Sequence, residues 1–133
     1  MSLMTWNETY RTNVSEVDAQ HEELFRLMND LHDSLTQDRA VVAEKLNGVV
    51  QFVLNHFATE EKYMQETNYP NYAEHKEAHD KLVETVGGLQ AKFNAGEAEL
   101  TEEVTAFVRD WLYNHIPGTD KNYGPYLNEK GIS

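Results

Sequence analysis

Five histidines and two carboxylates in this sequence have the residue types and spacing of a metal-binding site. The seven candidate ligands are His21, His56, Glu60, His75, His79, His115 and Asp120. On a helix, the four-residue spacing of His75 and His79, and of His56 and Glu60, places each pair on one face, about 6 Å apart along the axis. Imidazole suits iron as well as zinc and copper, and a carboxylate can bridge two ions. Five rings and two carboxylates are too many donors for one ion, so the set favours a pair of ions with one coordination position left for a small ligand.

Asp120 is the candidate whose placement needs a special device. It follows His115 by five residues, which on an ideal helix would point it about 140° away from that histidine. Pro117 lies between them, lacks a backbone N–H and clashes with the preceding turn. We therefore expect a kink or a restart of the helix there, which would turn Asp120 toward the other ligands.

The elements that must position these residues are helices. Apolar residues recur at intervals of three and four in four segments, and no sustained alternation of period two occurs. The pattern predicts helices over about 18–37, 39–66, 70–93 and 101–123. Short connections between long helices favour antiparallel neighbours, so we expect an all-α, up-down-up-down four-helix bundle. The five candidate histidines fall on the apolar, core-facing stripes of these helices.

Local signals suggest where the helices begin, continue and end. Asp18 is the expected N-cap of the first helix, because its carboxylate can accept an unpaired backbone N–H. The second helix is expected to continue through Asn47-Gly48, at a cost of about 1 kcal/mol for the glycine. Gly124-Pro125 should stop the fourth helix. Residues 1–17 should form an N-terminal arm that packs on the bundle through Trp6 and Tyr10.

Composition excludes several other classes of protein. A chain of 133 residues fits a single domain, residues 1–133. A net charge of −12 disfavours nucleic acid and anionic membranes as partners, and the absence of cysteine excludes disulfides, thiolate metal sites and iron–sulfur clusters. No stretch of about 18 apolar residues occurs, and residues Met1 to Asn7 lack the basic start and apolar run of a signal peptide, so we expect a cytoplasmic protein without membrane insertion.

In the order and spacing of several motifs, the chain resembles the hemerythrins, in particular the single-domain bacteriohemerythrins. The resemblance covers nearly the whole chain. Its pieces are Asp18-Ala19-Gln20-His21; His56-Phe57 with Glu60-Glu61 and Met64; Tyr69-Pro70 with His75 and His79; and His115-Ile116 with Asp120 and Tyr123. Each motif is weak alone, and their joint occurrence is specific.

The resemblance implies a non-haem di-iron centre, bridged by an oxo or hydroxo group, that binds dioxygen reversibly. By motif position, His75, His79 and His115 would bind one iron, and His21 and His56 the other. Glu60 and Asp120 would bridge the two ions. The family's oxygen pocket corresponds to Leu24, Phe57, Trp111, Leu112 and Ile116. Iron rather than manganese rests on the resemblance, because the ligand types permit either.

A binding protein for oxygen storage, transport or delivery is the leading hypothesis, and it predicts no enzymatic activity. Oxygen or iron sensing, a di-iron oxidase or peroxidase, and a purely structural bundle are the alternatives. Expected partners are dioxygen and an oxygen-consuming enzyme, with a monomer favoured. His32 lies eleven residues from His21, about 16 Å along the same helix, so we expect it to be structural.

Overall fold

The computed structural model describes residues 3–6, 8–97, 99–116 and 121–133. Within these residues all regular structure is helical and no strand occurs. The helices are α1 (Ser15–Asp33), α2 (Arg39–Glu66), α3 (Tyr72–Asn94), α4 (Glu102–His115) and α5 (Lys121–Glu129), with short 3-10 turns η1 (Glu8–Tyr10) and η2 (Ser34–Thr36).

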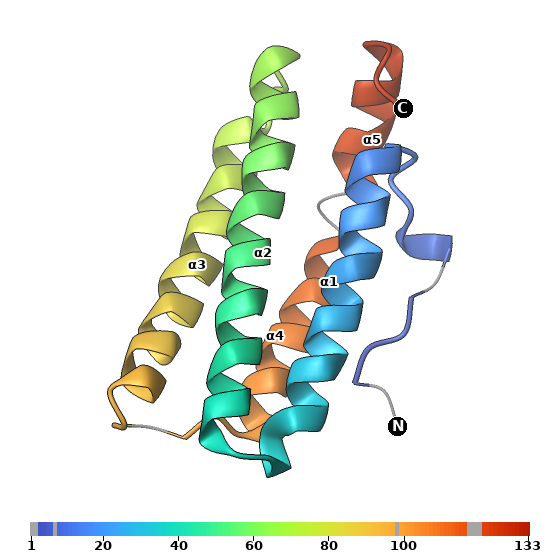
Figure 1. Ribbon diagram of the computed structural model, residues 1–133. Helices are drawn as coiled ribbons and strands as arrows, with labels where there is room; N and C mark the ends of the chain where they lie inside the picture. The colour runs from blue at the N-terminus through green and yellow to red at the C-terminus, as the bar shows by residue number, and fades with distance from the viewer. Residues whose placement is uncertain (1–2, 7, 98, 117–120) are drawn as a thin grey trace.

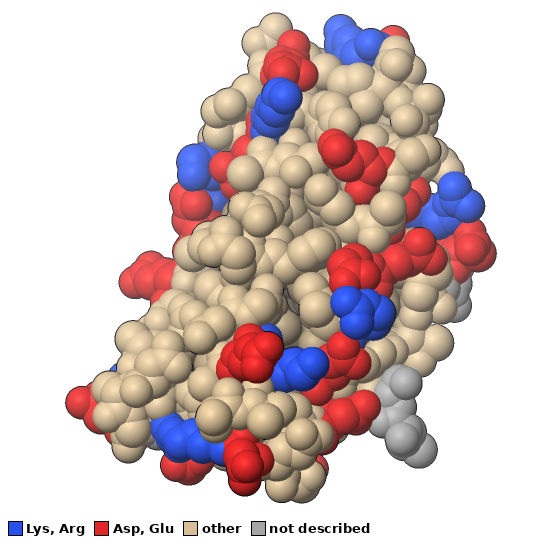
Figure 2. Space-filling view, viewed as in Figure 1, with Lys and Arg blue, Asp and Glu red and all other residues tan. Residues whose placement is uncertain are grey.

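Helices α1 to α4 run alternately in opposite directions, and α5 lies beyond the end of α4, beside the start of α1 (Figure 1). This arrangement confirms the predicted all-α four-helix bundle. None of the described helices combines the length and the apolar character needed to cross a membrane. Figure 2, which is viewed as in Figure 1, shows an uncharged area over α2 and α3 with acidic and basic side chains at its border.

Apolar side chains fill the half of the bundle away from the candidate ligands. Met28, Leu31, Leu46 and Leu82 are each at most 4 % exposed. Burying a side chain of this size contributes about 1.5–3 kcal/mol to stability. This core fixes how the four helices meet and so where their polar side chains converge.

The N-terminal arm packs on the bundle through aromatic contacts, as expected. The ring of Trp6 lies 5.5 Å from that of Phe25, and Tyr10 stacks on Tyr113 at 5.8 Å. The arm thereby joins α1 to α4.

Two local expectations were wrong. Helix α1 begins at Ser15 after Val14, so Asp18 lies inside it, where its carboxylate accepts the backbone N–H groups of Thr12 at 2.7 Å and Asn13 at 3.1 Å. The carboxylate thus holds the chain that enters the helix rather than the first helical turn itself.

Gly124-Pro125 does not stop a helix, because both residues lie within α5. Pro125 is close to the start of that helix, where a missing N–H removes at most one hydrogen bond. The chain instead divides earlier, with α4 ending at His115 and α5 beginning at Lys121. As predicted, α2 continues without interruption through Asn47-Gly48.

The end of the bundle near α5 is closed by a second apolar cluster, formed by Val14, Val17, Tyr123 and Leu127. Gly124 lies directly against the backbone carbonyl of Thr12, which leaves no room for a side chain. The start of the chain and α5 therefore pack tightly together.

Candidate metal centre

Each of the helices α1 to α4 contributes at least one candidate ligand to one buried region. His21 comes from α1, His56 and Glu60 from α2, His75 and His79 from α3, and His115 from α4. All six side chains are buried, with exposed fractions from 0 to 6 %. Asp120 lies outside the described residues, so its predicted role stays a prediction.

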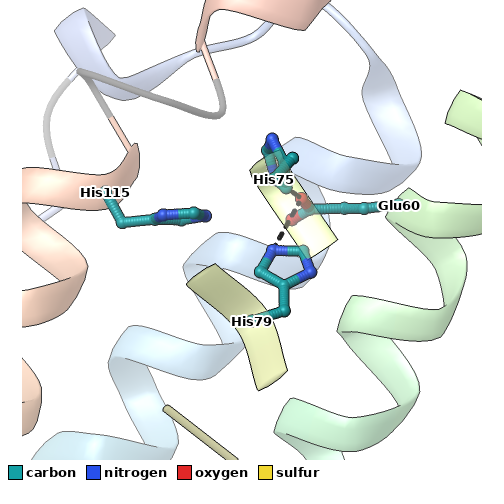
Figure 3. Close-up of side chains that lie close together, drawn as sticks. All are labelled: Glu60, His75, His79 and His115. Carbon is teal, nitrogen blue, oxygen red and sulfur yellow. Dashed lines mark hydrogen bonds and ion pairs between the residues drawn. The ribbon is translucent and has the colours of Figure 1, made fainter. Parts of the chain in front are cut away.

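The six residues form two overlapping groups, each compact enough to hold a metal ion. One group is Glu60, His75, His79 and His115, and the other is His21, His56 and Glu60. In each group the potential ligand atoms lie within 4.8 Å of one another. Figure 3 shows Glu60 reaching toward His75 and His79 of α3, with His115 of α4 approaching from the opposite side.

Glu60 lies between the two groups, and its two oxygens face different imidazoles. Oε2 is 3.1 Å from Nε2 of His75 and 3.5 Å from Nε2 of His79. Oε1 is 3.4 Å from Nε2 of His21 and also contacts Nε2 of His56. A carboxylate in this position can bridge two cations by binding one with each oxygen.

The surroundings of Glu60 favour its charged form. Burial alone would raise the pKa of Glu60, but the charge of His56 and hydrogen bonds from three imidazoles outweigh this effect and hold the pKa well below its usual range. A buried carboxylate anion surrounded by imidazole nitrogens is a suitable set of donors for hard and borderline divalent cations.

Residues outside the two groups orient two of the rings. The Nδ1 of His56 lies 2.6 Å from Oε1 of Gln20, whose amide nitrogen donates to Thr59 at 3.3 Å. In a neutral ring with the proton on Nδ1, the lone pair of Nε2 is available to bind a cation beside Glu60.

His79 is held in the same way on the other side of the centre. Its Nδ1 lies 3.1 Å from Oε2 of Glu61, which also forms an ion pair with Lys76 at 3.6 Å. Burial raises the pKa of Glu61, and Lys76 opposes this rise. Gln20 and Glu61 belong to the motifs that carry the family resemblance, but no role was predicted for either, because their partners come from other helices.

Aromatic rings enclose the imidazoles. Phe57 stacks on His79 with ring centroids 3.7 Å apart, and Trp111 stacks on His115 at 4.3 Å. Tyr123, which is fully buried, meets His75 edge to face at 5.4 Å. These contacts restrict rotation of the imidazoles before any ion is bound.

The five residues proposed to line an oxygen pocket lie in or beside the apolar core. Leu24, Phe57, Leu112 and Ile116 are at most 4 % exposed, and Trp111 is half-buried. Their role as a pocket stays a prediction. His32 belongs to neither metal-binding group, and its Nδ1 lies 2.8 Å from the hydroxyl of Thr105, which accords with the structural role expected of it.

Comparison with known proteins identifies a family and several similar proteins for this chain. Residues 12–127 match the family described as "Hemerythrin HHE cation binding domain". The chain is 47 % identical to the bacteriohemerythrin of Methylococcus capsulatus over 96 % of its own length and 99 % of the relative's, and 33 % identical to the myohemerythrin of Theromyzon tessulatum over 89 % and 88 %. A crystal structure of wild-type hemerythrin superposes with a TM-score of 0.92 and 47 % identity, covering 95 % of this chain and 98 % of the other.

Proposed function

Because the chain belongs to the hemerythrin family, we propose that it binds dioxygen reversibly at a non-haem di-iron centre and stores, transports or delivers it. The buried histidine–glutamate group is a cation-binding site of the hemerythrin type. The proposed ligands are His21, His56, Glu60, His75, His79, His115 and Asp120. We propose a carrier rather than an enzyme, with dioxygen as its ligand.

The position of Glu60 is the observation that supports this proposal most strongly. A single fully buried carboxylate directs one oxygen toward His75 and His79 and the other toward the imidazoles of α1 and α2. A mononuclear site would need only one of these groups. Two groups that share one carboxylate fit a pair of ions better, as the number of donors also suggests.

Iron fits the donors, which are neutral imidazoles and carboxylates without any thiolate. When bound, a pair of ferrous ions supplies one electron each to dioxygen. The paired Glu-x-x-His motifs of ferritin-like di-iron enzymes are absent from the sequence. The chemistry expected of this imidazole-rich centre is therefore binding rather than oxidation of a substrate.

The residues around the centre have two tasks in the proposed function. Gln20 and Glu61 keep Nδ1 of His56 and of His79 engaged, so that Nε2 of each ring stays directed at the centre. Phe57, Leu112 and Ile116 exclude water, because their apolar side chains are almost fully buried. Water and protons would otherwise promote release of reduced oxygen species, so this exclusion favours reversibility.

The test is to load the protein with ferrous iron under argon, measure the iron content, and record visible spectra through repeated exposure to air and argon. We expect two iron ions per chain, a coloured form in air, and return of the colourless form under argon over many cycles. One ion per chain would contradict the paired centre. Continuous consumption of oxygen with release of product would favour an enzyme.

A further inference from the structure

The exposed face of α2 has no charged residue over its central part, in a chain with a net charge of −12. No Asp, Glu, Lys or Arg occurs between residues 46 and 59, although several side chains in this stretch point to solvent. Figure 2 shows the corresponding uncharged area over α2 and α3, with charged side chains at its margins. Because charged residues are absent from this stretch, two copies would repel one another less here than at an acidic surface.

Six exposed residues of α2 lie on one line along the helix. Its members are Glu44, Gly48, Gln51, Asn55, Ala58 and Lys62, with alternating steps of four and three, and other exposed residues such as Asn47 and Leu54 lie beside it. Such steps keep all six within about 40° of a common line on the helix surface. We call this line the α2 stripe.

The α2 stripe of one copy is complementary to the α2 stripe of a second copy that runs in the opposite direction. In an antiparallel pair centred on residue 53, Glu44 of one copy faces Lys62 of the other, and Gly48 faces Ala58. Gln51 faces Asn55 close to the centre. Opposite charges, small residues and amides thus meet their counterparts, which is what a twofold symmetric contact requires.

Two further features of this face suit close contact. Adding a Cβ at Gly48, or at Gly87 of α3, would meet no atom within 4 Å, so folding of the single chain does not require glycine there. Glycine destabilises a helix relative to alanine, and a close approach of another backbone is a usual reason to keep it. Leu54, which is 41 % exposed, borders a groove lined by Val50, Val83 and Gly87 and supplies apolar area beside the centre.

We propose that two copies of this chain associate through the α2 stripe as an antiparallel, twofold symmetric pair. The contact consists of amides and small residues with limited apolar area, so the dimer is weak and depends on concentration. This differs from the monomer favoured by sequence alone. The inference does not depend on the proposed oxygen binding, because every residue in it lies on the outer surface.

The first experiment is sedimentation analysis of the iron-loaded full chain over a series of protein concentrations. Wild type should shift from monomer to dimer. Ala58→Glu should weaken association by about tenfold or more, because it places a charge in the contact. The matched control is Phe107→Glu, which changes the other large exposed apolar side chain, on α4, and should leave association unchanged.

Charge reversal distinguishes this pairing from non-specific association. Glu44→Lys and Lys62→Glu change the net charge in opposite directions, yet each should weaken the dimer, because each creates two like-charged pairs. The double variant restores the opposite pairs at an unchanged net charge and should recover wild-type association. Association that simply followed net charge would overturn the proposed register.

Cross-linking gives a second, independent readout, since the native chain has no cysteine. Gln51→Cys and Asn55→Cys should form disulfide-linked dimers faster when mixed than either variant does alone, because residue 51 faces residue 55 across the axis. A wild type that stays monomeric at every concentration, or equal cross-linking in the mixed and separate samples, would overturn the proposal. Circular dichroism and iron content would verify that each variant is folded.

Discussion

Replacing Gln20 by leucine should weaken one half of the metal centre and leave the other half unchanged. Oε1 of Gln20 lies 2.6 Å from Nδ1 of His56, and Nε2 of Gln20 donates to Thr59 at 3.3 Å. Leucine has a similar size and removes both hydrogen bonds. The ring of His56 then loses the contact that fixes its rotation and keeps Nε2 directed at Glu60.

The magnitude follows from the nature of these contacts. A neutral hydrogen bond contributes about 0.5–1.5 kcal/mol net, and removing an outer partner of a metal-bound histidine costs about 10–100-fold in affinity. Gln20 is uncharged and only half-buried, so we expect the lower end, about tenfold, which corresponds to about 1.4 kcal/mol. The metal-free protein should lose about 1 kcal/mol of its free energy of unfolding.

The assay is release of iron to an excess of chelator, followed in time. Two ions in different surroundings should leave in two phases. Gln20→Leu should accelerate the phase from the side of His21 and His56, whereas Glu61→Leu should accelerate the other phase, because Glu61 contacts His79.

The control is Gln37→Leu. Gln37 is exposed and lies in the connection between α1 and α2, so this substitution should change neither phase. The reasoning is refuted if Gln20→Leu releases iron at the wild-type rate, or if the Gln20 and Glu61 variants accelerate the same phase.

Three other predictions concern single side chains. His79→Ala should lose iron and lower the thermal midpoint of the iron-loaded protein, because binding and folding are coupled when ligands come from separate helices; metal analysis with calorimetry would show this, and full iron content would contradict it. Leu112→Ala should keep iron but oxidise faster by admitting water, and should cost about 2–5 kcal/mol of stability; an unchanged autoxidation rate would remove Leu112 from the pocket. Gly124→Ala should destabilise the fold by more than about 1 kcal/mol, because its Cβ would collide with the carbonyl of Thr12, whereas Gly88→Ala meets no atom within 4 Å and should raise stability by up to about 1 kcal/mol in denaturant unfolding.

The helices could be predicted from the sequence because buried residues recur at intervals of three and four along each of them. The steps from His75 and His79 through Leu82 to Phe93 define a single face of α3, and all four side chains are buried. Asn47-Gly48 was predicted correctly to lie within a helix, because the apolar pattern on both sides of the pair outweighed a local turn signal.

Contacts with irregular or distant segments could not be predicted in this way. Asp18 has the residue type of a helix cap, but its partners Thr12 and Asn13 lie in an irregular segment before α1 that has no periodicity. Gly124 resembles a helix terminator, whereas the reason for glycine there is the carbonyl of Thr12, 112 residues earlier in the chain. Residue type indicated that these positions are special, and only the tertiary structure shows why.

In the candidate site, the inward-facing ligands could be predicted from the sequence, but the residues that orient them could not. Imidazole and carboxylate spacing identified the inward side chains, because i, i+4 pairs on a helix share a face. Gln20 and Glu61 could not be given roles, since hydrogen bonds from α1 to α2 and from α2 to α3 depend on the relative rotation of the helices.

The packing of Tyr123 and Leu127 of α5 against Val14 and Val17 has a consequence for how the protein matures. Translation proceeds from the amino end, so α5 leaves the ribosome after the helices that hold the histidines. A nascent chain therefore lacks the contact between Tyr123 and His75 until α5 packs against the segment around Thr12. We therefore expect an ion to reach His75 more easily before α5 has packed, and to be released more slowly afterwards.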